Sequence, residues 1–541
     1  MHKGLHPDAP SHHDTRLGRV VAGTGVRAMG SRLTLTILGS VLTASLLILL
    51  LTGDAFDALL PALVTTIAYA VWAQPLRRTV LPLIFAECFL FAPTSNDDLV
   101  PYASGPLWDF VVNPGNHALN MYLNKVTDFS FLSLTGHELA YPLLLVVIIC
   151  RSLSGSRVDK DDGRTPPANV MYFALAAELC TVAAMEAWGW MRGGDMRSSL
   201  FQIRTFIWLP IQTVVIMYAL RDMRDFRKVA LLVTAATVLK ALAGLYFMSR
   251  DVWARNYEVP YMTGHQDSVP YVAVFFLWLA VWLHRPLWRR LLLFLPIFAT
   301  MVTAIVVNDR RLAWVAFVAA PVTLIPLATG RLKFRLRRTL LFASPFIVVY
   351  LVLSRSITTG IFSPGAELMG MANATDASTI WRELENTNLI YTLRQYRIFG
   401  SGWGHEYIEF ISLPSISGSY AQYRLIAHNS VLWLLGVAGI VGFALIWTPI
   451  VVGVYLAARS YRFARTVPDR VAACTCVAVM ACYVNQAWGD IGMATAVPTL
   501  LLACALAAAA RLARETGAWP GGMQLTNAGS VHPQRDGSPA E

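Results

Sequence analysis

The stretch Leu33–Thr52 reads LTLTILGSVLTASLLILLLT and contains no charged side chain. About 20 apolar residues in an α-helix cross the roughly 30 Å hydrocarbon core of a bilayer, so this stretch predicts a transmembrane helix. The 32 residues before it are polar and basic, unlike a secretory signal peptide, whose short apolar segment lies close to the N-terminus. We therefore expect a membrane-embedded chain rather than a secreted one.

Composition extends this prediction to the whole chain. Of 541 residues, 55% are hydrophobic and 14% are charged, and the mean hydropathy is +0.50. Soluble proteins carry about 25% charged residues, so a soluble multidomain enzyme is excluded. The seven cysteines lie in or beside apolar stretches, which excludes a disulfide scaffold. The net charge of +11 comes from basic residues between hydrophobic runs, a pattern typical of a polytopic membrane protein and not of a nucleic-acid-binding protein.

Similar apolar runs along the chain predict fourteen spans in an all-α fold. They lie near 33–52, 57–74, 79–93, 136–150, 168–189, 201–220, 229–248, 268–284, 291–308, 312–330, 339–354, 428–456, 471–487 and 495–510. The chain then divides into a basic cytoplasmic tail (1–32), transmembrane helices 1–11 (33–354), a large extracytoplasmic loop (355–427), helices 12–14 (428–510) and a disordered cytoplasmic tail (511–541).

The distribution of Lys and Arg predicts the orientation of these spans. One set of alternate loops, together with both termini, carries 30 basic residues, and the opposite set carries 12. Because basic loops are retained in the cytoplasm, we expect both termini to be cytoplasmic. Of the 12 basic residues on the outer side, 11 are arginines. A guanidinium grips phosphate in two places, so this set predicts an anionic ligand bound outside, although ion pairs with nearby carboxylates are an alternative reading.

The loop 355–427 is the longest polar segment, and long loops without function are uncommon. Asp376 or Ser378 could cap a helix that runs to about Phe399. Arg382 and Glu385, three residues apart, could pair on its surface. The glycines of 400–404 are not a phosphate-loop motif. His428 follows at the outer lip of a span, where it could act as a general base or simply be satisfied by backbone at a helix start.

Three segments, in this order, resemble the O-antigen ligase and Wzy-type polymerase superfamily. Asn308–Trp314 (NDRRLAW) resembles the family's Ser-Arg-Gly-Ala-Trp element. Tyr391–Gly404, ending in RIFGSGWG, resembles a stretch of the family's large outer loop. His428–Leu432 (HNSVL) resembles its His-Asn-x-x-Leu segment. The similarity covers roughly residues 300–450, and it implies a GT-C-like membrane glycosyltransferase.

The resemblance also implies site residues. Arg311 matches the arginine of the first element, Arg382 matches the large-loop arginine, and His428 matches the family histidine. Arg310 stands where the family usually has Ser and Leu312 where it has Gly, so either arginine of the pair could meet phosphate. Further candidates that could contact the substrate come from their position at the outer side. They are Arg204, Arg255, His265, Asp490 and, competing with Arg382, Arg394 and Arg397.

The reaction that uses these residues needs neither metal nor cofactor. Arginines would stabilise the charge that grows on a departing pyrophosphate, and His428 would take the proton of an attacking sugar hydroxyl. Direct displacement would invert the anomeric carbon. Asp97 and Asp98, adjacent carboxylates in the outer segment 94–135, form no convincing metal cage. Lys240 lies deep in a span, where we expect it to pair with a buried glutamate.

We interpret the chain as a metal-independent inverting glycosyltransferase that polymerises O-antigen or exopolysaccharide repeat units. Its donor would be an undecaprenyl-pyrophosphate-linked glycan at the outer face of the bacterial inner membrane, and its acceptor a second lipid-linked glycan. An O-antigen ligase that uses lipid A-core or a protein as acceptor is the alternative, and a lipid-linked glycan flippase is the alternative from another class. A chain-length regulator is a possible partner, and no nucleic acid is expected.

Overall fold

The computed structural model describes residues 36, 39–50, 53, 55–91, 105–122, 134–154, 166–257, 261–286, 288–308, 310–357, 362, 365–366, 377–418 and 422–520. In these residues the secondary structure is helical apart from one isolated bridge between Tyr122 and Thr135, which confirms the all-α prediction. The chain forms two units, Met1–Pro75 and Leu76–Glu541. The first contains an apolar helix, Gly39–Leu50, and α2, Ala55–Ala73.

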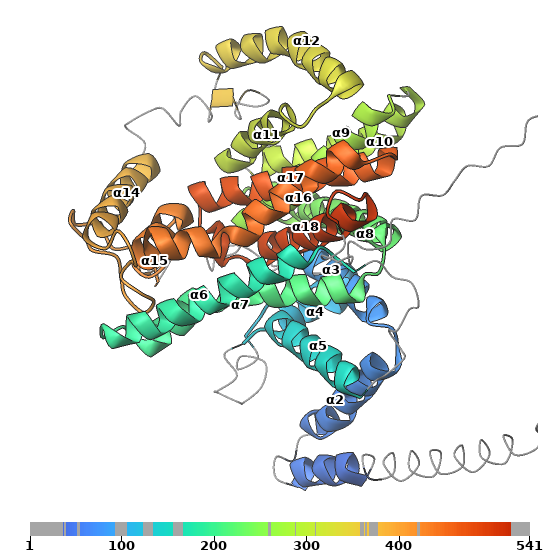
Figure 1. Cartoon of the computed structure of the whole chain (residues 1–541), viewed down its shortest axis with the longest axis vertical. Helices are drawn as coiled ribbons and strands as arrows, with labels where there is room; N and C mark the ends of the chain where they lie inside the picture. Colours follow the sequence, from blue (N-terminus) through green and yellow to red (C-terminus); the bar gives the residue numbers. More distant parts are fainter. Residues whose placement is uncertain are drawn as a thin grey trace, which may run out of the picture. The chain divides into compact units, whose positions relative to one another are not determined.

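The second unit holds the remaining helices. They are α3 Arg77–Phe89, α4 Asn113–Leu119, α5 Gly136–Leu153, α6 Asn169–Met191, α7 Met196–Ala219, α8 Met223–Phe247, α9 Ser268–His284, α10 Trp288–Val307, α11 Arg311–Leu324, α12 Gly330–Ser354, α14 Ala377–Gln395, α15 Ser430–Ile446, α16 Thr448–Phe463, α17 Val467–Gly489 and α18 Ala496–Glu515. Helices α6, α7, α16, α17 and α18 run side by side (Figure 1). Alanine-rich α18 is the most buried, because small side chains let several helices approach it closely.

Nine of the helices in the described residues are long and apolar enough to cross a membrane. The chain is therefore a polytopic helical membrane protein, but the predicted count of fourteen spans is not confirmed. Helix α11 has only 14 residues, and α3 has 13 with a proline inside. The predicted span 428–456 is two helices, α15 and α16, which meet at Trp447. Gly439 kinks α15, with a φ of 64°.

The C-terminal boundary also needs correction. The prediction that disorder begins at residue 511 is wrong, because α18 continues to Glu515. Arg511 is buried in the second unit, and its Nη2 donates to the backbone carbonyl of Leu220 at 3.2 Å. Helix α14 begins at Ala377 and ends at Gln395, close to the helix predicted up to about Phe399. Asp376, a predicted cap, lies outside the described residues.

Contacts between helix ends agree with the two predicted sets of loops. At one end of the bundle, Arg335 Nη1 donates to the carbonyl of Leu283 at 2.8 Å, and Arg227 lies 3.8 Å from Asp469. All four belong to the basic set of loops and adjoining helix ends, so we call this the basic end. At the other end, Arg382 Nη1 donates to the carbonyl of Gly489 at 3.1 Å. We call that the loop end. Which of the two faces the cytoplasm stays a prediction.

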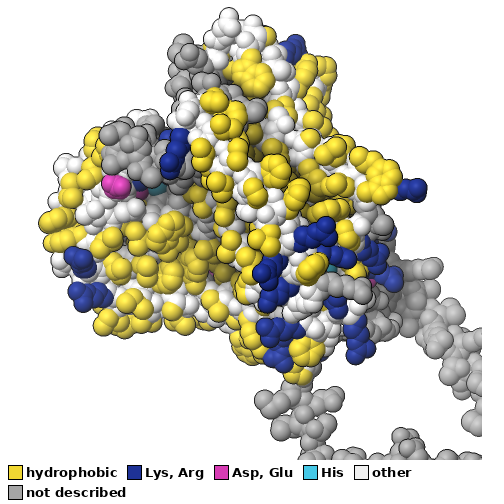
Figure 2. Space-filling view, turned by 90° about the horizontal axis from the view of Figure 1, so that it is seen from above, with side chains coloured by type: hydrophobic (Ala, Val, Ile, Leu, Met, Phe, Trp, Pro, Cys, Tyr) yellow, Lys and Arg dark blue, Asp and Glu magenta, His cyan; other side chains and the backbone are white. Residues whose placement is uncertain are grey.

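Charged side chains on the surface are also concentrated at the two ends of the bundle. Lys and Arg side chains gather at one end of the face seen in Figure 2, and a small group of acidic, basic and His side chains lies towards the other. Most of the surface between them is hydrophobic (Figure 2). Such a band, with charge confined to its borders, is what a chain surrounded by lipid requires.

The run Gly400–Gly404 anchors the segment after α14 onto the bundle. Gly402 has a φ of 84°, and a Cβ built on it would lie 2.4 Å from Gly189 Cα at the end of α6. Trp403 is fully buried next to it, with its ring centroid 5.4 Å from that of Phe206 and 5.9 Å from that of Trp433. The glycines therefore permit a backbone-to-backbone contact that inserts one large aromatic side chain.

Gly402→Ala should destabilise the protein strongly. The change adds a Cβ where φ is positive and where the backbone of Gly189 leaves no room, so the loss should exceed the roughly 1 kcal/mol of a simple glycine effect. Thermal unfolding of the purified protein in detergent measures it. Gly418→Ala is the matched control, because a Cβ there would meet nothing within 4 Å. Equal midpoints for the two variants would contradict the packing described.

Candidate functional site

A polar pocket lies at the loop end of the second unit, where α9 and α11 begin and α17 ends. It encloses about 210 Å³. We call it the Arg311 pocket. Its lining residues are His265, Ser268, Arg310, Arg311, Leu312, Arg382, Gln486 and Asp490. The pocket thus combines Arg310, Arg311 and Arg382 with two of the secondary candidates, His265 and Asp490.

The start of α11 gives the pocket an electropositive wall. Arg311 is the first residue of that helix, so the free amide hydrogens of its first turn and its dipole favour an anion there. Asn485 Nδ2 on α17 donates to the carbonyl of Leu312 at 3.0 Å. A Cβ on Gly489 would lie 2.1 Å from a Leu312 methyl group, so glycine is what allows α11 to approach α17 this closely.

The two other arginines reach the pocket from different directions. Arg310 packs its guanidinium 3.8 Å from the ring centroid of Tyr261, which fixes it by a cation–π contact. Arg382 comes from α14, and its bond to the carbonyl of Gly489 ties α14 to the end of α17. Three guanidinium groups from two segments, the start of α11 and α14, therefore line one cavity, and such a group of cations suits a diphosphate.

The opposite wall carries one carboxylate. Asp490 Oδ2 lies 2.9 Å from His265 Nδ1, and Asp490 Oδ1 accepts from the Ile491 amide at 2.9 Å. Burial acts to raise the pKa of Asp490, but the bond and charge of His265 and the Ile491 amide outweigh it, so that pKa lies below its usual value. Ser268 Oγ is buried and has no hydrogen-bond partner within the described residues.

Asp490→Asn should show the pH dependence that this lowered pKa implies. A carboxyl whose folded-state pKa is depressed stabilises the fold above its unfolded pKa of about 3.9, and the stabilisation is lost as pH falls through the folded value. The variant should therefore melt below wild type near pH 6, and the difference should shrink as pH falls below about 4 towards the folded-state pKa. Thermal unfolding in detergent across that range checks this, and a difference independent of pH would contradict it.

His428 lies beside the Arg311 pocket but does not line it. Its Nδ1 is 3.3 Å from Glu385 Oε1, and its backbone N–H donates to Glu385 Oε2 at 3.2 Å. Its ring meets that of Trp381 edge-on, with centroids 5.0 Å apart. The Glu385 carboxylate is buried, whereas the His428 side chain is 25% exposed. An imidazole held by a buried carboxylate and partly open to solvent is arranged as a base with an orienting partner.

Two connections bring His428 close to the pocket. Glu385 lies one turn of α14 after Arg382, so one helix presents both residues. Ser430 Oγ, two residues after His428, donates to the backbone carbonyl of Asp490 at 3.1 Å. The surface pair predicted between Arg382 and Glu385 is not formed, because Glu385 is buried against His428.

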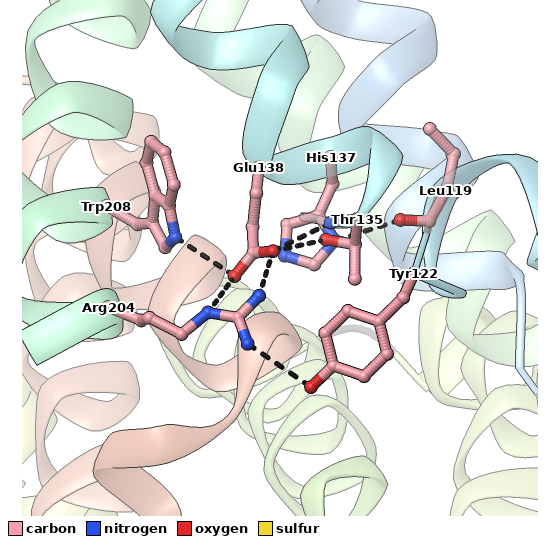
Figure 3. A network of polar contacts seen from close by, with 7 residues as sticks. All are labelled: Leu119, Tyr122, Thr135, His137, Glu138, Arg204 and Trp208. Atoms are coloured by element: carbon pink, nitrogen blue, oxygen red, sulfur yellow. Dashed lines mark hydrogen bonds and ion pairs between the residues drawn. The ribbon is translucent and has the colours of Figure 1, made fainter. Parts of the chain in front are cut away.

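Arg204 belongs to a different cavity, of about 180 Å³, between α5, α7 and α18. Its Nε donates to Glu138 Oε1 at 2.8 Å, and its Nη2 pairs with the other carboxylate oxygen (Figure 3). Trp208 Nε1 also donates to Glu138, at 3.1 Å, and Arg204 Nη1 donates to the hydroxyl of Tyr122 at 3.2 Å. This network holds the start of α5 against α7. A residue that binds the donor phosphates would have to line the Arg311 pocket. Arg204 does not line it.

Three other predicted candidates lie outside the pocket. Arg255, which is half exposed, pairs with the buried carboxylate of Asp251 at 3.5 Å. Arg394 and Arg397 are exposed and do not line the cavity, so Arg382 is the arginine of α14 that reaches it. The expectation that Lys240 pairs with a glutamate is wrong, because its partner is Asp267, at 2.8 Å. Asp97 and Asp98 lie outside the described residues.

Sequence reasoning missed three residues of this region. Glu385 holds His428, Gln486 Nε2 donates to Asp490 Oδ2 at 3.2 Å, and Ser268 lines the pocket. Glu385 carried a signal, because a helix places it one turn after Arg382 and on the same side. Gln486 carried a similar signal, because it lies one helical turn before Asp490. Nothing in the sequence distinguished Ser268 from an ordinary helix start.

Comparison with known proteins bears on the same region. No curated protein matches the chain in sequence. The family model described as O-antigen ligase matches residues 296–447, a range that contains Arg310, Arg311, Arg382, Glu385 and His428. This match confirms the resemblance predicted over roughly residues 300–450 and indicates a membrane enzyme of the ligase or polymerase type. Over residues 296–447, a little more than a quarter of the chain, the protein is therefore similar to the O-antigen ligase family.

Proposed function

We propose that this protein transfers a glycan from undecaprenyl pyrophosphate to a sugar hydroxyl, and that the reaction polymerises O-antigen or exopolysaccharide repeat units. The observation that carries the proposal is the meeting of Arg310, Arg311 and Arg382 in one pocket at a helix N-terminus. A departing pyrophosphate needs such fixed positive charge, because its own negative charge grows in the transition state.

In this reaction the diphosphate lies in the Arg311 pocket and the attached sugar extends towards His428. One turn of α14, about 5 Å, separates Arg382 from Glu385, the partner of the imidazole. The acceptor hydroxyl approaches the anomeric carbon from the side of His428, which takes its proton while Glu385 orients the ring and stabilises the imidazolium. The C–O bond to the phosphate breaks as the new glycosidic bond forms, which inverts the anomeric configuration.

The proposed location is the bacterial inner membrane, with the loop end facing the periplasm and both termini in the cytoplasm. The count of 30 basic residues on one side against 12 on the other supports this orientation. Cysteine labelling decides it. A cysteine introduced at exposed Arg197, at the loop end, should react with a membrane-impermeant reagent in intact spheroplasts, and one introduced at Arg224 should not.

The activity test is glycan transfer by the purified full-length protein with an undecaprenyl-pyrophosphate-linked donor, with and without chelator. His428→Gln should lower the rate about 10²–10⁴-fold, the usual range for loss of a general base. His117→Gln, an exposed histidine outside the pocket, is the control. Full activity of His428→Gln would remove the proposed base, and loss of wild-type activity in chelator would contradict the metal-independent mechanism.

The acceptor distinguishes polymerisation from ligation. Deleting the gene of a polymerase leaves single repeat units attached to surface lipid, whereas deleting that of a ligase leaves long polymer on undecaprenyl carriers. Gel analysis of surface glycan and of the carrier-linked pool therefore decides between the two. The second candidate function is that of a ligase with lipid A-core as its acceptor.

A further inference from the structure

A larger cavity, which shares no lining residue with the Arg311 pocket or with the cavity of Arg204, lies in the same bundle. It encloses about 370 Å³ between α8, α9 and α17, with α18 as its floor. Apart from its mouth, its lining is almost entirely apolar. We call it the apolar slot. None of its lining residues belongs to the Arg311 pocket.

Small side chains create this slot. Ala472 and Cys476 line it from α17, and Cys504, Ala505 and Ala508 line it from α18. None of these side chains is large enough to fill the space between the two helices and α8. A water-filled cavity needs polar partners for its waters, and this lining offers very few, so the slot suits a hydrocarbon chain.

The length of the slot matches one leaflet of a membrane. Along α9 the lining runs from Ala273 to Arg285, and along α17 it runs from Val467 to Val479. Twelve residues of α-helix rise about 18 Å, and the hydrocarbon of one leaflet is about 15 Å thick. An acyl chain that enters at the surface would therefore be accommodated over its full depth.

The mouth of the slot is positively charged. Arg227 at the start of α8 and Arg285 at the end of α9 are the only cations that line the slot in the described part of the chain. Arg227 is 54% exposed, and its contact with Asp469 is long, at 3.8 Å, so its guanidinium can still donate hydrogen bonds to another anion. Lys228, next to Arg227, pairs with Asp225 instead. One carboxylate against two guanidinium groups leaves a net positive charge at the entrance.

The mouth lies at the basic end, opposite the Arg311 pocket. His265 and Ser268 at the start of α9 line that pocket, whereas Arg285 at the end of the same helix lines the mouth of the slot. Likewise, α17 enters the slot at Val467 and reaches the pocket at Asp490. A lipid in the slot would thus come from the leaflet opposite the glycan site.

We propose that the apolar slot binds one acyl chain of an anionic phospholipid, whose phosphate is held by Arg227 and Arg285. The headgroup lies among the basic residues of the leaflet at the basic end, and the acyl chain separates α8 from α17 along the depth of the slot. This proposal is independent of the proposed glycan transfer, because the two cavities share no residue.

Native mass spectrometry tests the proposal. The full-length protein in detergent is incubated with dioleoyl phosphatidylglycerol or with dioleoyl phosphatidylcholine, and the lipid that stays bound after the detergent is removed is measured. Wild type should retain one phosphatidylglycerol in preference to phosphatidylcholine. Arg227→Gln with Arg285→Gln should reduce that preference by about fivefold per arginine, the usual contribution of a basic residue near an anionic membrane surface. Glycerol 3-phosphate alone should not bind, because it lacks the acyl chain.

Two further variants separate the slot from general surface charge. Arg224→Gln removes an exposed arginine on the same turn of α8 that does not line the slot, and it should leave the preference unchanged. Ala505→Leu narrows the slot, and it should lower retention of both lipids. Equal loss in Arg224→Gln and in the double variant, or equal retention of the two lipids by wild type, would overturn the proposal.

Discussion

Arg311→Gln is expected to slow glycan transfer by about 10²–10³-fold, the usual loss when one charge-stabilising donor is removed from a transition state. Glutamine keeps much of the side-chain volume but removes the positive charge and the fork that holds two oxygens. Arg311 sits at the first position of α11 and lines the pocket with Arg382. Its loss should therefore lower kcat, with a smaller effect on KM, since the charge on the leaving group grows as the bond breaks.

Arg197→Gln is the matched control, because this arginine is exposed at the loop end and does not line the pocket. Arg310→Gln, measured beside Arg311→Gln, decides which member of the pair acts on the phosphate. Arg310 packs against Tyr261, so we expect its loss to affect activity less. Wild-type turnover by both Arg311→Gln and Arg310→Gln would remove the start of α11 from the mechanism, whichever acceptor is used.

Local sequence patterns predicted the features that depend on neighbours in the chain. Apolar runs located most of the long helices, because a span in lipid must satisfy its own backbone and so leaves a continuous hydropathy signal. Helix α14 was predicted from the residues that could cap its start. The count of fourteen spans is not confirmed, since runs such as α11 are apolar but too short to cross a bilayer by themselves.

The site was predictable where a family motif marks it and not where packing builds it. Arg310, Arg311 and Arg382 do meet, and the resemblance had singled them out. Arg204 was chosen for its position near the outer side, but Glu138, 66 residues earlier, provides its partner. Only the packing of α5 against α7 reveals that pair, and no spacing rule along the chain contains it.

Lys240→Met should strongly destabilise the second unit. Lys240 Nζ and Asp267 Oδ1 are 2.8 Å apart, and both side chains are 1% exposed. Removing one partner of a buried pair leaves the other charge without compensation, at a cost of about 3–5 kcal/mol. Asp267 immediately precedes α9, beside Ser268 and His265 of the pocket. Loss of the pair should therefore disturb the glycan site as well as the fold, and thermal unfolding and the transfer assay measure the two effects.

The double variant Lys240→Met with Asp267→Leu separates charge from shape. It removes both ions and keeps apolar volume in the same space, so its stability should recover most of what Lys240→Met loses. If the double variant is as unstable as the single one, the ion pair is not what the site requires, and the packing of Lys240 near Phe91 becomes the better explanation. Recovery of stability without recovery of activity would mean that the ion pair positions the turn at His265–Asp267. The buried pair would then serve the geometry of the pocket and not the stability of the fold.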